Sequence, residues 1–375
     1  MKICIDIRTV NKPKSGVGYY VSNLVRKFQE IDKDNYYLLI SNIAELEPEL
    51  RSLPNFENCK TMISNENHIF GDFWESFYLP RFLSRKGVNV FHGPAFMIPL
   101  RSCITRSVVT IHDIVAFIKP ETVPLKYALY MRTLISLVVK KADMIITPSQ
   151  STKDDLMRVL GVSESKIVVT HEAVSESFCP GALDGGEDKI KSRFGIKNKY
   201  MLFVGNLEPR KNLIRLLKAY EMAKGRLGKE YQLVICGKKG WLYKNILKAV
   251  EDFSQNGDVI LTSYVEDNDL LELYRGAEMF LFPTLYEGFG LPVLEAMASG
   301  TPVITSNVSS IPEIAGDAAY LIDPLSITDI SNAIIKVAFS DTLRRSLREK
   351  GIKQATRFSW SQTAEKTLAV YRSII

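Results

Sequence analysis

The stretch EMFLFPTLYEGFGLPVLEA, residues 278–296, contains the transition that decides the fold of this chain. Its first part, EMFLFP, has the continuous apolar pattern of a buried parallel strand, and a glycine-rich turn follows it. Pro292 suits the first turn of a helix, where its missing N–H would be unpaired in any case. The stretch therefore predicts a strand, a crossing loop, and a helix whose N-terminus lies at Gly288–Gly290.

The same alternation of strand and helix occurs along the whole chain. Buried strands are predicted at 2–7, 36–40, 89–92, 107–113, 143–147 and 167–170, and again at 200–205, 231–237, 258–263, 278–283 and 301–306. Helical patterns such as 211–224 and 266–276 lie between them. A segment rich in Gly, Asp and Lys at 179–199 separates the two series. These features predict an α/β protein with two Rossmann-like, doubly wound domains that bind ligands in a cleft at the carboxyl ends of the strands.

Length and composition agree with this prediction. A chain of 375 residues is too long for one ordinary core, so two domains are expected. It is 46% hydrophobic and 24% charged, and it has no apolar run of the length that crosses a bilayer. The first residues lack the apolar core of a signal peptide, which favours a cytoplasmic protein.

Cysteine spacing and charge argue against several classes of protein. The five cysteines are scattered without a CxxC pair, so neither disulfides nor a zinc site is expected, and no metal or cofactor is predicted. Residues 1–180 carry 22 basic and 19 acidic side chains and the remainder 26 and 23, which gives each half +3. Because no basic tail or stripe is present, nucleic acid binding is not expected. The segment 124–142 is the one candidate for contact with an anionic membrane, although a buried helix is the favoured interpretation.

Two glutamates flank the predicted helix start. Glu287 precedes the helix and Glu295 lies about one turn inside it, so both can face one ligand without sharing a proton. The free amides of Gly288–Gly290 favour an anion, and a carboxylate can bind a ribose diol. A diphosphate between two hydroxyl-bearing rings, which is a nucleotide sugar, fits this pattern. The alternative is a glycine turn with two solvated glutamates.

A second segment, VGNLEPRKNL (204–213), also follows a strand and is predicted to open a helix. Arg210 and Lys211 are expected in its first turn, where cations are unfavourable unless an anion is bound. The pair therefore predicts a phosphate site that neutralises a departing group.

The N-terminal half contributes two weaker signals. Gly16, Val17 and Gly18 predict an amide-rich loop between a strand and a helix, although a lone GxG is not specific. His112 and Asp113 are predicted to end the strand at 107–113, and a reactive side chain belongs at a carboxyl end in this architecture. A structural histidine is the alternative for His112.

Together these motifs resemble glycosyltransferase family 4, the retaining nucleotide-sugar transferases of GT-B fold, over nearly the whole chain. The most specific feature is the spacing of Glu287 and Glu295, followed by GNLEPRKN, TIHD and SGVG. FWESFYLPRFL (73–83) and VFHGP (90–94) are similar to the mannosyltransferase-B-like branch, which builds O-antigen and related polysaccharides. The ending RFSWSQTAEKTLAVYRSI is similar to the family's C-terminal helix, which crosses back to the N-terminal domain.

The resemblance implies a domain layout. It predicts an acceptor-binding domain at 1–180, a linker at 181–199, a nucleotide-sugar-binding domain at 200–357 and a crossing helix at 358–375.

The resemblance also implies roles for single residues. Glu295 would hold the ribose, Glu287 hydroxyls of the donor sugar, and Lys211 the diphosphate. The implied catalytic residues are His112, Glu287, Lys211 and Arg210. The implied donor-binding residues are Glu295, Gly288, Phe289, Gly290, Leu291, Gly205, Asn206, Tyr264 and Val265. The implied acceptor or phosphate loop comprises Gly16, Val17, Gly18 and Asp113. Asn206 departs from the family, because many members have arginine there, and Arg210 is a candidate substitute.

The implied function is metal-independent transfer of a hexose to a saccharide acceptor in the synthesis of a bacterial surface polysaccharide. Mannose from GDP-mannose and a lipid-linked acceptor are the best match, with peripheral membrane contact. UDP-, dTDP- or ADP-sugars and a sugar-nucleotide epimerase of similar shape stay open as alternatives. A glycosidase would need no phosphate loops, and a dehydrogenase would need the full glycine fingerprint. A non-enzymatic nucleotide-binding module is disfavoured, because both halves are predicted to present loops to the cleft. The DND sequence at 267–269 is interpreted as helix capping rather than metal binding.

Overall fold

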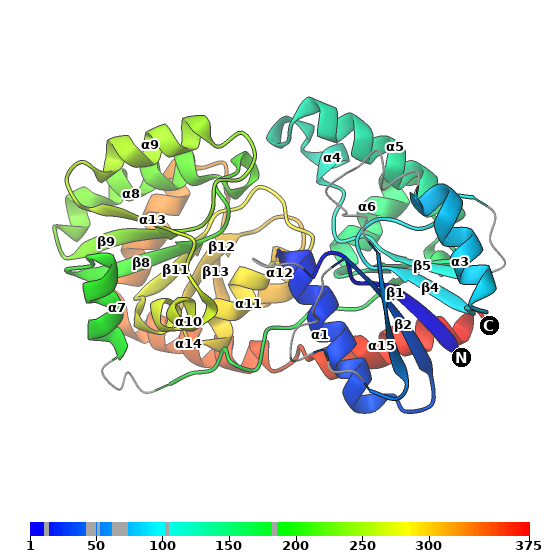
Figure 1. Cartoon of the computed structure of the whole chain (residues 1–375). Helices are drawn as coiled ribbons and strands as arrows, with labels where there is room; N and C mark the ends of the chain where they lie inside the picture. The colour runs from blue at the N-terminus through cyan, green and yellow to red at the C-terminus, as the bar shows by residue number, and fades with distance from the viewer. Residues whose placement is uncertain (11–14, 43–49, 51–52, 62–73, 102–104, 182–185) are drawn as a thin grey trace. The chain divides into compact units, whose positions relative to one another are not determined.

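A computed structural model describes residues 1–10, 15–42, 50, 53–61, 74–101, 105–181 and 186–375. The described chain divides into two compact units (Figure 1). Unit 1 comprises Met1–Ile114, Leu129–Glu172 and Ser359–Ile375, and unit 2 comprises Val115–Ala128 and Ala173–Phe358. Residues 11–14, Phe73 of the branch motif, Cys103 and part of the predicted linker lie outside the described residues. No helix in the described part is both long and apolar enough to cross a membrane.

Unit 1 is built on a seven-stranded parallel sheet with the order β3-β2-β1-β4-β5-β6-β7. Its strands are β1 (Lys2–Asp6), β2 (Tyr36–Ser41), β3 (Phe56–Lys60), β4 (Val90–Gly93), β5 (Arg106–Thr110), β6 (Met144–Thr147) and β7 (Ile167–Val169). The main helices are α1 (Gly16–Ile31), α3 (Leu79–Arg85), α5 (Leu125–Lys141), α6 (Gln150–Leu160) and α15 (Trp360–Ser373). The short helix α4 (Val115–Ile118) and the first residues of α5 are grouped with unit 2.

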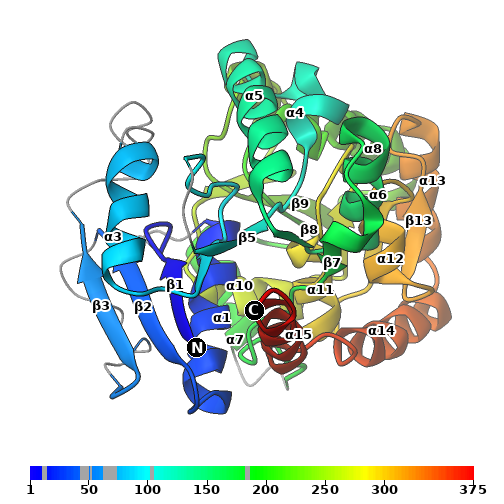
Figure 2. The same ribbon diagram turned by 90° about the vertical axis from the view of Figure 1, so that its right-hand side faces the viewer.

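The C-terminal helix α15 completes the core of unit 1. It begins at the side-chain cap of Ser359 and lies beside α1 in both views (Figures 1 and 2). Tyr371 on α15 is fully buried, and its hydroxyl lies 2.6 Å from Nδ1 of His92 on β4. Because burial lowers the pKa of His92 to about 3, this ring is neutral at physiological pH. The prediction that the last helix crosses back to the N-terminal domain is confirmed.

Unit 2 is built on a six-stranded parallel sheet with the order β10-β9-β8-β11-β12-β13. Its strands are β8 (Lys199–Val204), β9 (Tyr231–Cys236), β10 (Val259–Ser263), β11 (Met279–Phe282), β12 (Val303–Ser306) and β13 (Ala319–Ile322). Its helices are α7 (Gly186–Phe194), α8 (Leu213–Leu227), α9 (Lys244–Ser254), α10 (Asp267–Gly276), α11 (Leu291–Ala298), α12 (Ile311–Ala315), α13 (Ile327–Ala338) and α14 (Asp341–Ala355). Helices α8, α9 and α13 lie on one face of the sheet, and α10, α11 and α14 lie on the other (Figure 1).

The structure differs from the predicted elements mainly at sheet edges. Strands β3 and β13 were not predicted, because β3 mixes polar with apolar residues and β13 is an edge strand of only 4 residues. The segment 179–199, which was expected to separate the two series of strands and to include the linker at 181–199, contains helix α7. Ile190 and Phe194 of this helix pack against the core of unit 2, and Arg193 pairs with Asp269 on α10, so these contacts hold a mostly polar helix there. The DND sequence begins α10 as predicted, but the cap position is Glu266, without a side-chain cap.

Candidate functional site

The predicted donor-binding residues of unit 2 lie after the carboxyl ends of its parallel strands. Gly205 follows β8, Tyr264 and Val265 follow β10, and Glu287 lies in the loop after β11. Because parallel strands end at one edge of a sheet, this order brings segments far apart in sequence together. Leu285 N donates to the carbonyl oxygen of Arg210 at 2.7 Å, which joins the loop after β8 to the loop after β11.

A buried cluster of charges forms where these two loops meet. Arg210 Nη1 donates to Oε2 of Glu287 at 2.7 Å, and Lys211 Nζ donates to Oε1 at 2.7 Å. Thr284 Oγ1 also donates to Oε1 at 2.7 Å. Glu287 is 7% exposed and Lys211 is 6% exposed. Arg210 and Lys211, from the loop after β8, therefore both contact Glu287, the first residue of the EGFG loop, within unit 2.

The pKa values in this cluster follow from competition for one carboxylate. Burial raises the pKa of Glu287, but the charges of Arg210 and Lys211, with the hydrogen bonds from Lys211 and Thr284, lower it to about 2. The charged form of Lys211 is disfavoured by burial and by the neighbouring charge of Arg210. These two effects exceed the opposing effect of Glu287 and lower the pKa of Lys211 below its ordinary value. Both oxygens of Glu287 are thus occupied by protein donors, although the resemblance implied that they bind sugar hydroxyls.

Glu208 completes the cluster beside Arg210. Its Oε2 accepts a hydrogen bond from Arg210 Nε at 3.3 Å, and its Oε1 accepts one from Asn206 Nδ2 at 3.3 Å. Asn206 itself is exposed. The position at which many family members have arginine therefore carries an amide that helps to orient Glu208, while Arg210 brings its guanidinium to Glu287.

The prediction that Arg210 and Lys211 lie in the first turn of a helix is wrong. They belong to a 3₁₀ turn, Pro209–Lys211, and helix α8 begins only at Leu213. Asn212, between this turn and α8, has a left-handed backbone with φ of 63°. Its side-chain amide donates to the carbonyl oxygens of Pro283 and Pro324, which stabilises this break in the helix. The cations are held by Glu287 and by the turn, so the helix dipole of α8 does not explain them.

The glycine-rich loop opens helix α11 as predicted. Gly290 lies at the N-cap position with φ of 120°, and Pro292 lies in the first turn. A Cβ at Gly290 would come within 2.8 Å of Ile311 Cδ1, so a larger residue does not fit without movement. Ser310 Oγ lies 3.0 Å and 2.6 Å from the carbonyl oxygens of Glu287 and Phe289 and fixes the loop. Of the predicted amide donors, Gly288, Phe289 and Gly290 precede the helix and Leu291 begins it.

Glu295 lies on α11 beside a buried tyrosine. Tyr274 Oη donates to Glu295 Oε2 at 2.9 Å, and Tyr274 is fully buried with its ring edge against Phe178 and Phe280. Burial raises the pKa of Glu295 to about 7, even though the hydrogen bond from Tyr274 acts to lower it. A carboxylate that is poorly solvated and held by one donor keeps acceptor capacity for hydroxyl groups of a ligand.

The remaining predicted donor-site residues differ in exposure. Val265 is buried, whereas Tyr264 is 42% exposed, and the ammonium of Lys238 lies 4.7 Å from the centre of its ring. Gly205 N donates to the carbonyl oxygen of Cys236, and a Cβ at Gly237 would come within 1.9 Å of the carbonyl oxygen of Gly205. The ends of β8 and β9 therefore pack closely, and Tyr264 offers an accessible ring beyond them.

In unit 1, His112 lies two residues beyond the end of β5, which stops at Thr110 rather than at 113. His112 Nδ1 is 3.0 Å from Glu172 Oε1, and Nε2 is 2.8 Å from the carbonyl oxygen of Pro94. Asp113 is half-buried. His112 is therefore part of a buried polar pair, and Glu172 is a partner that the sequence analysis did not identify.

The predicted glycine loop of unit 1 is helical. Gly16 begins α1, and Ser15 is its N-cap, with Oγ accepting a hydrogen bond from Gly18 N at 3.2 Å. The expectation that Gly16, Val17 and Gly18 form a loop is thus wrong. Because a serine cap compensates for the low helix propensity of two glycines, the helix starts earlier than predicted.

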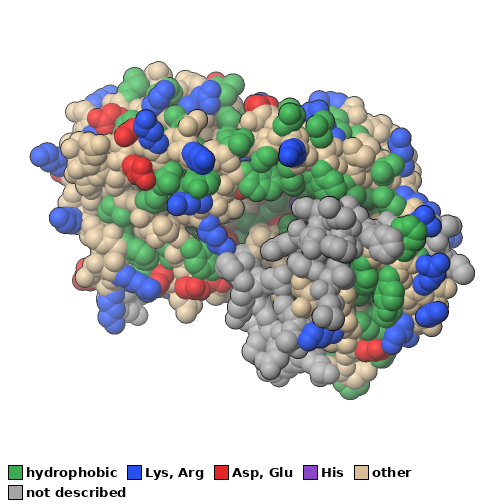
Figure 3. Space-filling view, turned by 45° about the horizontal axis from the view of Figure 1, so that its top comes forward, with side chains coloured by type: hydrophobic (Ala, Val, Ile, Leu, Met, Phe, Trp, Pro, Cys, Tyr) green, Lys and Arg blue, Asp and Glu red, His purple; other side chains and the backbone are tan. Residues whose placement is uncertain are grey.

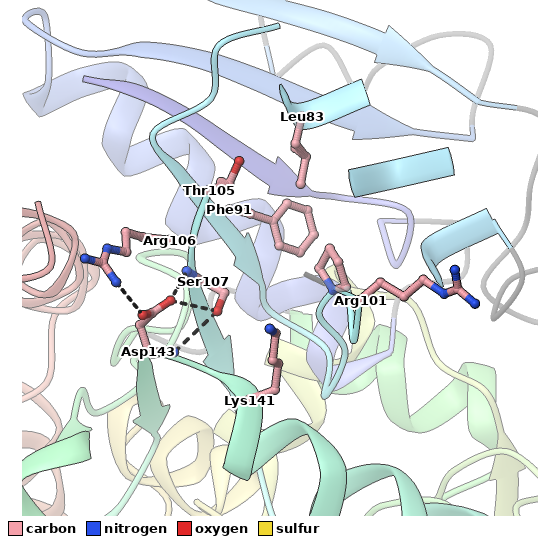
Figure 4. Close-up of a pocket in the computed structure, with 9 residues that line it drawn as sticks. Leu83, Phe91, Arg101, Thr105, Arg106, Ser107, Lys141 and Asp143 are labelled. Carbon is pink, nitrogen blue, oxygen red and sulfur yellow. Dashed lines mark hydrogen bonds and ion pairs between the residues drawn. The ribbon is translucent and has the colours of Figure 1, made fainter. Parts of the chain in front are cut away.

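A cavity of about 220 Å³ lies away from all these residues, in unit 1, beside the start of β5 (Figure 4). Arg101, Arg106 and Lys141 line it, but the guanidinium groups of Arg101 and Arg106 point in different directions. Arg106 is paired with Asp143 at 3.1 Å, and Arg101 packs on Phe77. The cations do not converge, so this cavity is not built for an anion. Among the described residues, no group of three or more His, Cys, Asp and Glu is placed to hold a metal ion.

The partners missed by the sequence analysis have recognisable positions. Glu172 follows the predicted strand at 167–170, so the rule that selected His112 also applies to it. Glu208 lies inside the quoted GNLEPRKN segment. Tyr274 gives no signal in the sequence, because a tyrosine on an amphipathic helix is most often a core residue.

Comparisons with known proteins agree with this arrangement. Residues 14–178 match the family model described as Glycosyltransferase Family 4, and residues 186–354 match Glycosyl transferases group 1. O-antigen chain mannosyltransferase B of Escherichia coli is 34% identical over 381 residues, covering 99% of this chain and 100% of the relative.

Two solved structures have the same fold over 100% of this chain. Sucrose-phosphate synthase from Thermosynechococcus elongatus has a TM-score of 0.78 with 18% identity and is covered over 99% of its length. Anabaena HepE in complex with UDP and glucose has a TM-score of 0.76 with 16% identity and is covered over 100% of its length. These likenesses confirm the two-domain GT-B fold. The chain belongs to glycosyltransferase family 4 and is a glycosyltransferase of the mannosyltransferase-B-like branch.

Proposed function

We propose that this glycosyltransferase moves mannose from GDP-mannose to a hydroxyl of a lipid-linked saccharide during synthesis of a bacterial surface polysaccharide. The relative that matches the whole chain is named an O-antigen chain mannosyltransferase, which supports the sugar and the pathway class. The observation that carries the transferase mechanism is the buried cluster of Arg210, Lys211 and Glu287. Two adjacent cations beside the start of α11 suit a diphosphate leaving group.

The cluster suggests how the donor is bound. A diphosphate offers its oxygens to Arg210 and Lys211 beside the start of α11, and so competes with Glu287 for the two cations. Glu287 is then released in part and can accept hydroxyl hydrogen bonds from the sugar. Glu295 accepts hydroxyls of the ribose, so that the two glutamates bind the two hydroxyl-bearing ends of one nucleotide sugar.

In our proposal the reaction proceeds with retention and without a metal ion. Arg210 and Lys211 stabilise the charge that develops on the leaving diphosphate, which is where electrostatic stabilisation has the largest effect. The leaving phosphate accepts the proton of the acceptor hydroxyl on the same face of the sugar. The bond from the sugar carbon to the phosphate oxygen breaks as the bond to the acceptor oxygen forms, so no protein nucleophile is required.

A donor screen tests the proposal. Purified protein is heated with GDP-mannose, and with UDP-, dTDP- and ADP-sugars as alternatives, because a ligand that binds only the native state raises the melting temperature. The expected result is the largest increase with GDP-mannose. A larger increase with another nucleotide sugar would change the proposed donor but would leave the proposed transferase activity in place.

An acceptor assay separates the transferase from an epimerase. With a lipid-linked saccharide present, a transferase releases free nucleoside diphosphate, whereas an epimerase of similar shape converts the sugar nucleotide and releases none. The assay includes Lys211→Ala as the inactive control and is run with and without a chelator. Epimerised sugar nucleotide without free diphosphate would contradict the proposal, and loss of activity with chelator would contradict its metal independence.

We also propose that helix α5 contacts the anionic membrane surface that carries such an acceptor. Leu125, Leu129 and Leu137 on this helix are 74%, 55% and 48% exposed. The segment 124–142 contains Lys and Arg but no Asp or Glu. Figure 3 shows hydrophobic and basic side chains on the face over α4 and α5, at the upper right. Exposed leucines among lysines and arginines favour an interfacial helix.

Sedimentation with vesicles tests this contact. Protein is mixed with vesicles of neutral phosphatidylcholine, or of the same lipid with phosphatidylglycerol, and pelleted. Binding is expected only with the anionic lipid and is expected to fall when Leu129 and Leu137 are replaced by glutamine. The matched control is Met222→Gln, an exposed apolar residue on α8. Equal binding of both variants and the parent would contradict a role for α5.

A further inference from the structure

Both ring nitrogens of His112 face hydrogen-bond acceptors. Nδ1 is 3.0 Å from Glu172 Oε1, and Nε2 is 2.8 Å from the carbonyl oxygen of Pro94. His112 is 9% exposed and Glu172 is 5% exposed, so water does not replace either partner easily. A carbonyl oxygen can only accept, and an ionised carboxylate can only accept. A neutral imidazole has one N–H and leaves one of these contacts without a hydrogen.

The surrounding elements decide which group carries the second proton. Tyr20 on α1 makes a T-shaped ring contact with His112, with 4.8 Å between ring centres, and its hydroxyl is 3.2 Å from Thr110 Oγ1. His92 on β4 is neutral and bonded to Tyr371 and Thr110. Among the described residues, the carboxylates of Glu172 and of the adjacent Asp113 are the charged groups that act on His112. A positive ring beside two carboxylates is favoured over a neutral one.

We propose that Glu172 holds His112 as a buried imidazolium cation, which makes Glu172 a positioning residue of the transfer reaction. The ion pair fixes the ring between Tyr20 and Phe96, which it meets in T-shaped contacts, and keeps an N–H on each nitrogen. To donate to a sugar hydroxyl, His112 releases only the carbonyl oxygen of Pro94, while Glu172 retains the ring. This catalytic consequence rests on the proposed function, but the protonation state does not.

The balance of burial and charge agrees with the geometry. Burial lowers the pKa of His112, but the hydrogen bond and charge of Glu172, with the Pro94 carbonyl and Asp113, raise it above its ordinary value. A histidine whose pKa is raised in the folded state stabilises the fold at low pH and loses that contribution as pH rises through its folded pKa. Removing Glu172 should therefore cost more stability at pH 6 than at pH 9.

Nitrogen NMR of the whole chain tests the protonation state without donor or acceptor. The sequence has four histidines, so a His112→Asn spectrum identifies the resonances of His112 in protein labelled with ¹⁵N-histidine. Both nitrogens are expected to show imidazolium shifts at pH 7. A neutral single tautomer at pH 7, with the second proton on Glu172, would overturn the proposal even if transferase activity were present.

Two variants separate positioning from folding. Glu172→Gln is expected to lower the proton affinity of His112 at least about tenfold, and Glu176→Gln, an exposed glutamate four residues away, is expected to leave it unchanged. The kcat of Glu172→Gln should then fall with rising pH in a range where the parent is constant. If Glu172→Gln fails to fold, the parent titration alone decides. If the imidazolium is found but no nucleotide sugar is consumed, the proposed function fails and the inference stands.

Discussion

The charge of Glu287 should contribute strongly to the stability of unit 2. Glu287→Gln keeps the shape of the side chain but removes the negative charge that faces Arg210 and Lys211. In this variant Arg210 retains its hydrogen bonds to Glu208 and to the carbonyl oxygen of Tyr286. Lys211 is buried, and among the contacts described above Glu287 is the carboxylate that accepts its hydrogen bond. The substitution therefore leaves mainly one buried ammonium without its counter-charge.

The size of the effect follows from the pKa of Glu287. A fall from the ordinary value of 4.5 to about 2, at about 1.4 kcal/mol for each tenfold change in proton affinity, corresponds to about 3 kcal/mol. Breaking a buried ion pair by removing one partner costs about 3–5 kcal/mol in general. For a unit of about 200 residues, about 3 kcal/mol lowers the melting temperature by roughly 6–12 °C.

Scanning calorimetry at pH 7 measures the effect on the transition of unit 2. Glu272→Gln is the matched control, because it breaks a partly exposed ion pair between neighbouring turns of α10, with Arg275, and should change stability by less than about 1 kcal/mol. Since the pKa of Glu287 is lowered on folding, its contribution is complete above pH 4.5 and is lost as pH falls toward about 2. The gap between parent and Glu287→Gln should therefore shrink in acid.

A melting temperature for Glu287→Gln within about 1 °C of the parent at pH 7 would refute the reasoning. It would mean that Lys211 is solvated or neutral without Glu287. The double variant Glu287→Gln with Lys211→Met should recover much of the loss, because replacing both partners removes the unpaired charge.

Three further predictions address the donor site and the last helix. Lys211→Ala should raise the dissociation constant of the nucleoside diphosphate at least about tenfold, and an unchanged constant by calorimetric titration would exclude a phosphate contact. Burial raises the pKa of Glu295 to about 7, so affinity for the ribose should increase between about pH 6 and 8 as the carboxylate ionises. Tyr274→Phe removes a hydrogen bond that lowers this pKa and should move the midpoint of the affinity–pH curve upward. The control Tyr220→Phe should leave this midpoint unchanged. Tyr371→Phe should cost unit 1 about 1 kcal/mol by removing the contact with His92, measured by chemical unfolding.

Most of the fold was predictable because buried parallel strands are apolar on both faces. Every predicted strand corresponds to an observed one, and the helix start at Leu291 follows from Pro292 and the glycines. The edge strands β3 and β13 were missed, because the apolar run of β3 is interrupted and that of β13 is only 4 residues long. The start of α1 was misjudged, because a single cap at Ser15 outweighed two glycines.

The site was predictable as a set of loops but not as a set of contacts. The positions of Arg210, Lys211 and Glu287 after strand ends follow from the sequence, and their meeting is a consequence of strand order. Both oxygens of Glu287 accept hydrogen bonds from the cations, and Lys211 lies 76 residues away in the sequence. No local sequence pattern predicts such a contact. The roles implied for Glu295 and His112 stay predictions.

Helix α15 has a consequence for how the polypeptide matures. The segment Ala173–Phe358 of unit 2 is synthesised before α15 leaves the ribosome. The core of unit 1 is completed only when α15 packs on it and buries Tyr371. The first strands of unit 1 are therefore synthesised earliest, but their core is completed last. A nonsense codon just after residue 358 should leave unit 1 open and exposed to proteases while unit 2 is intact.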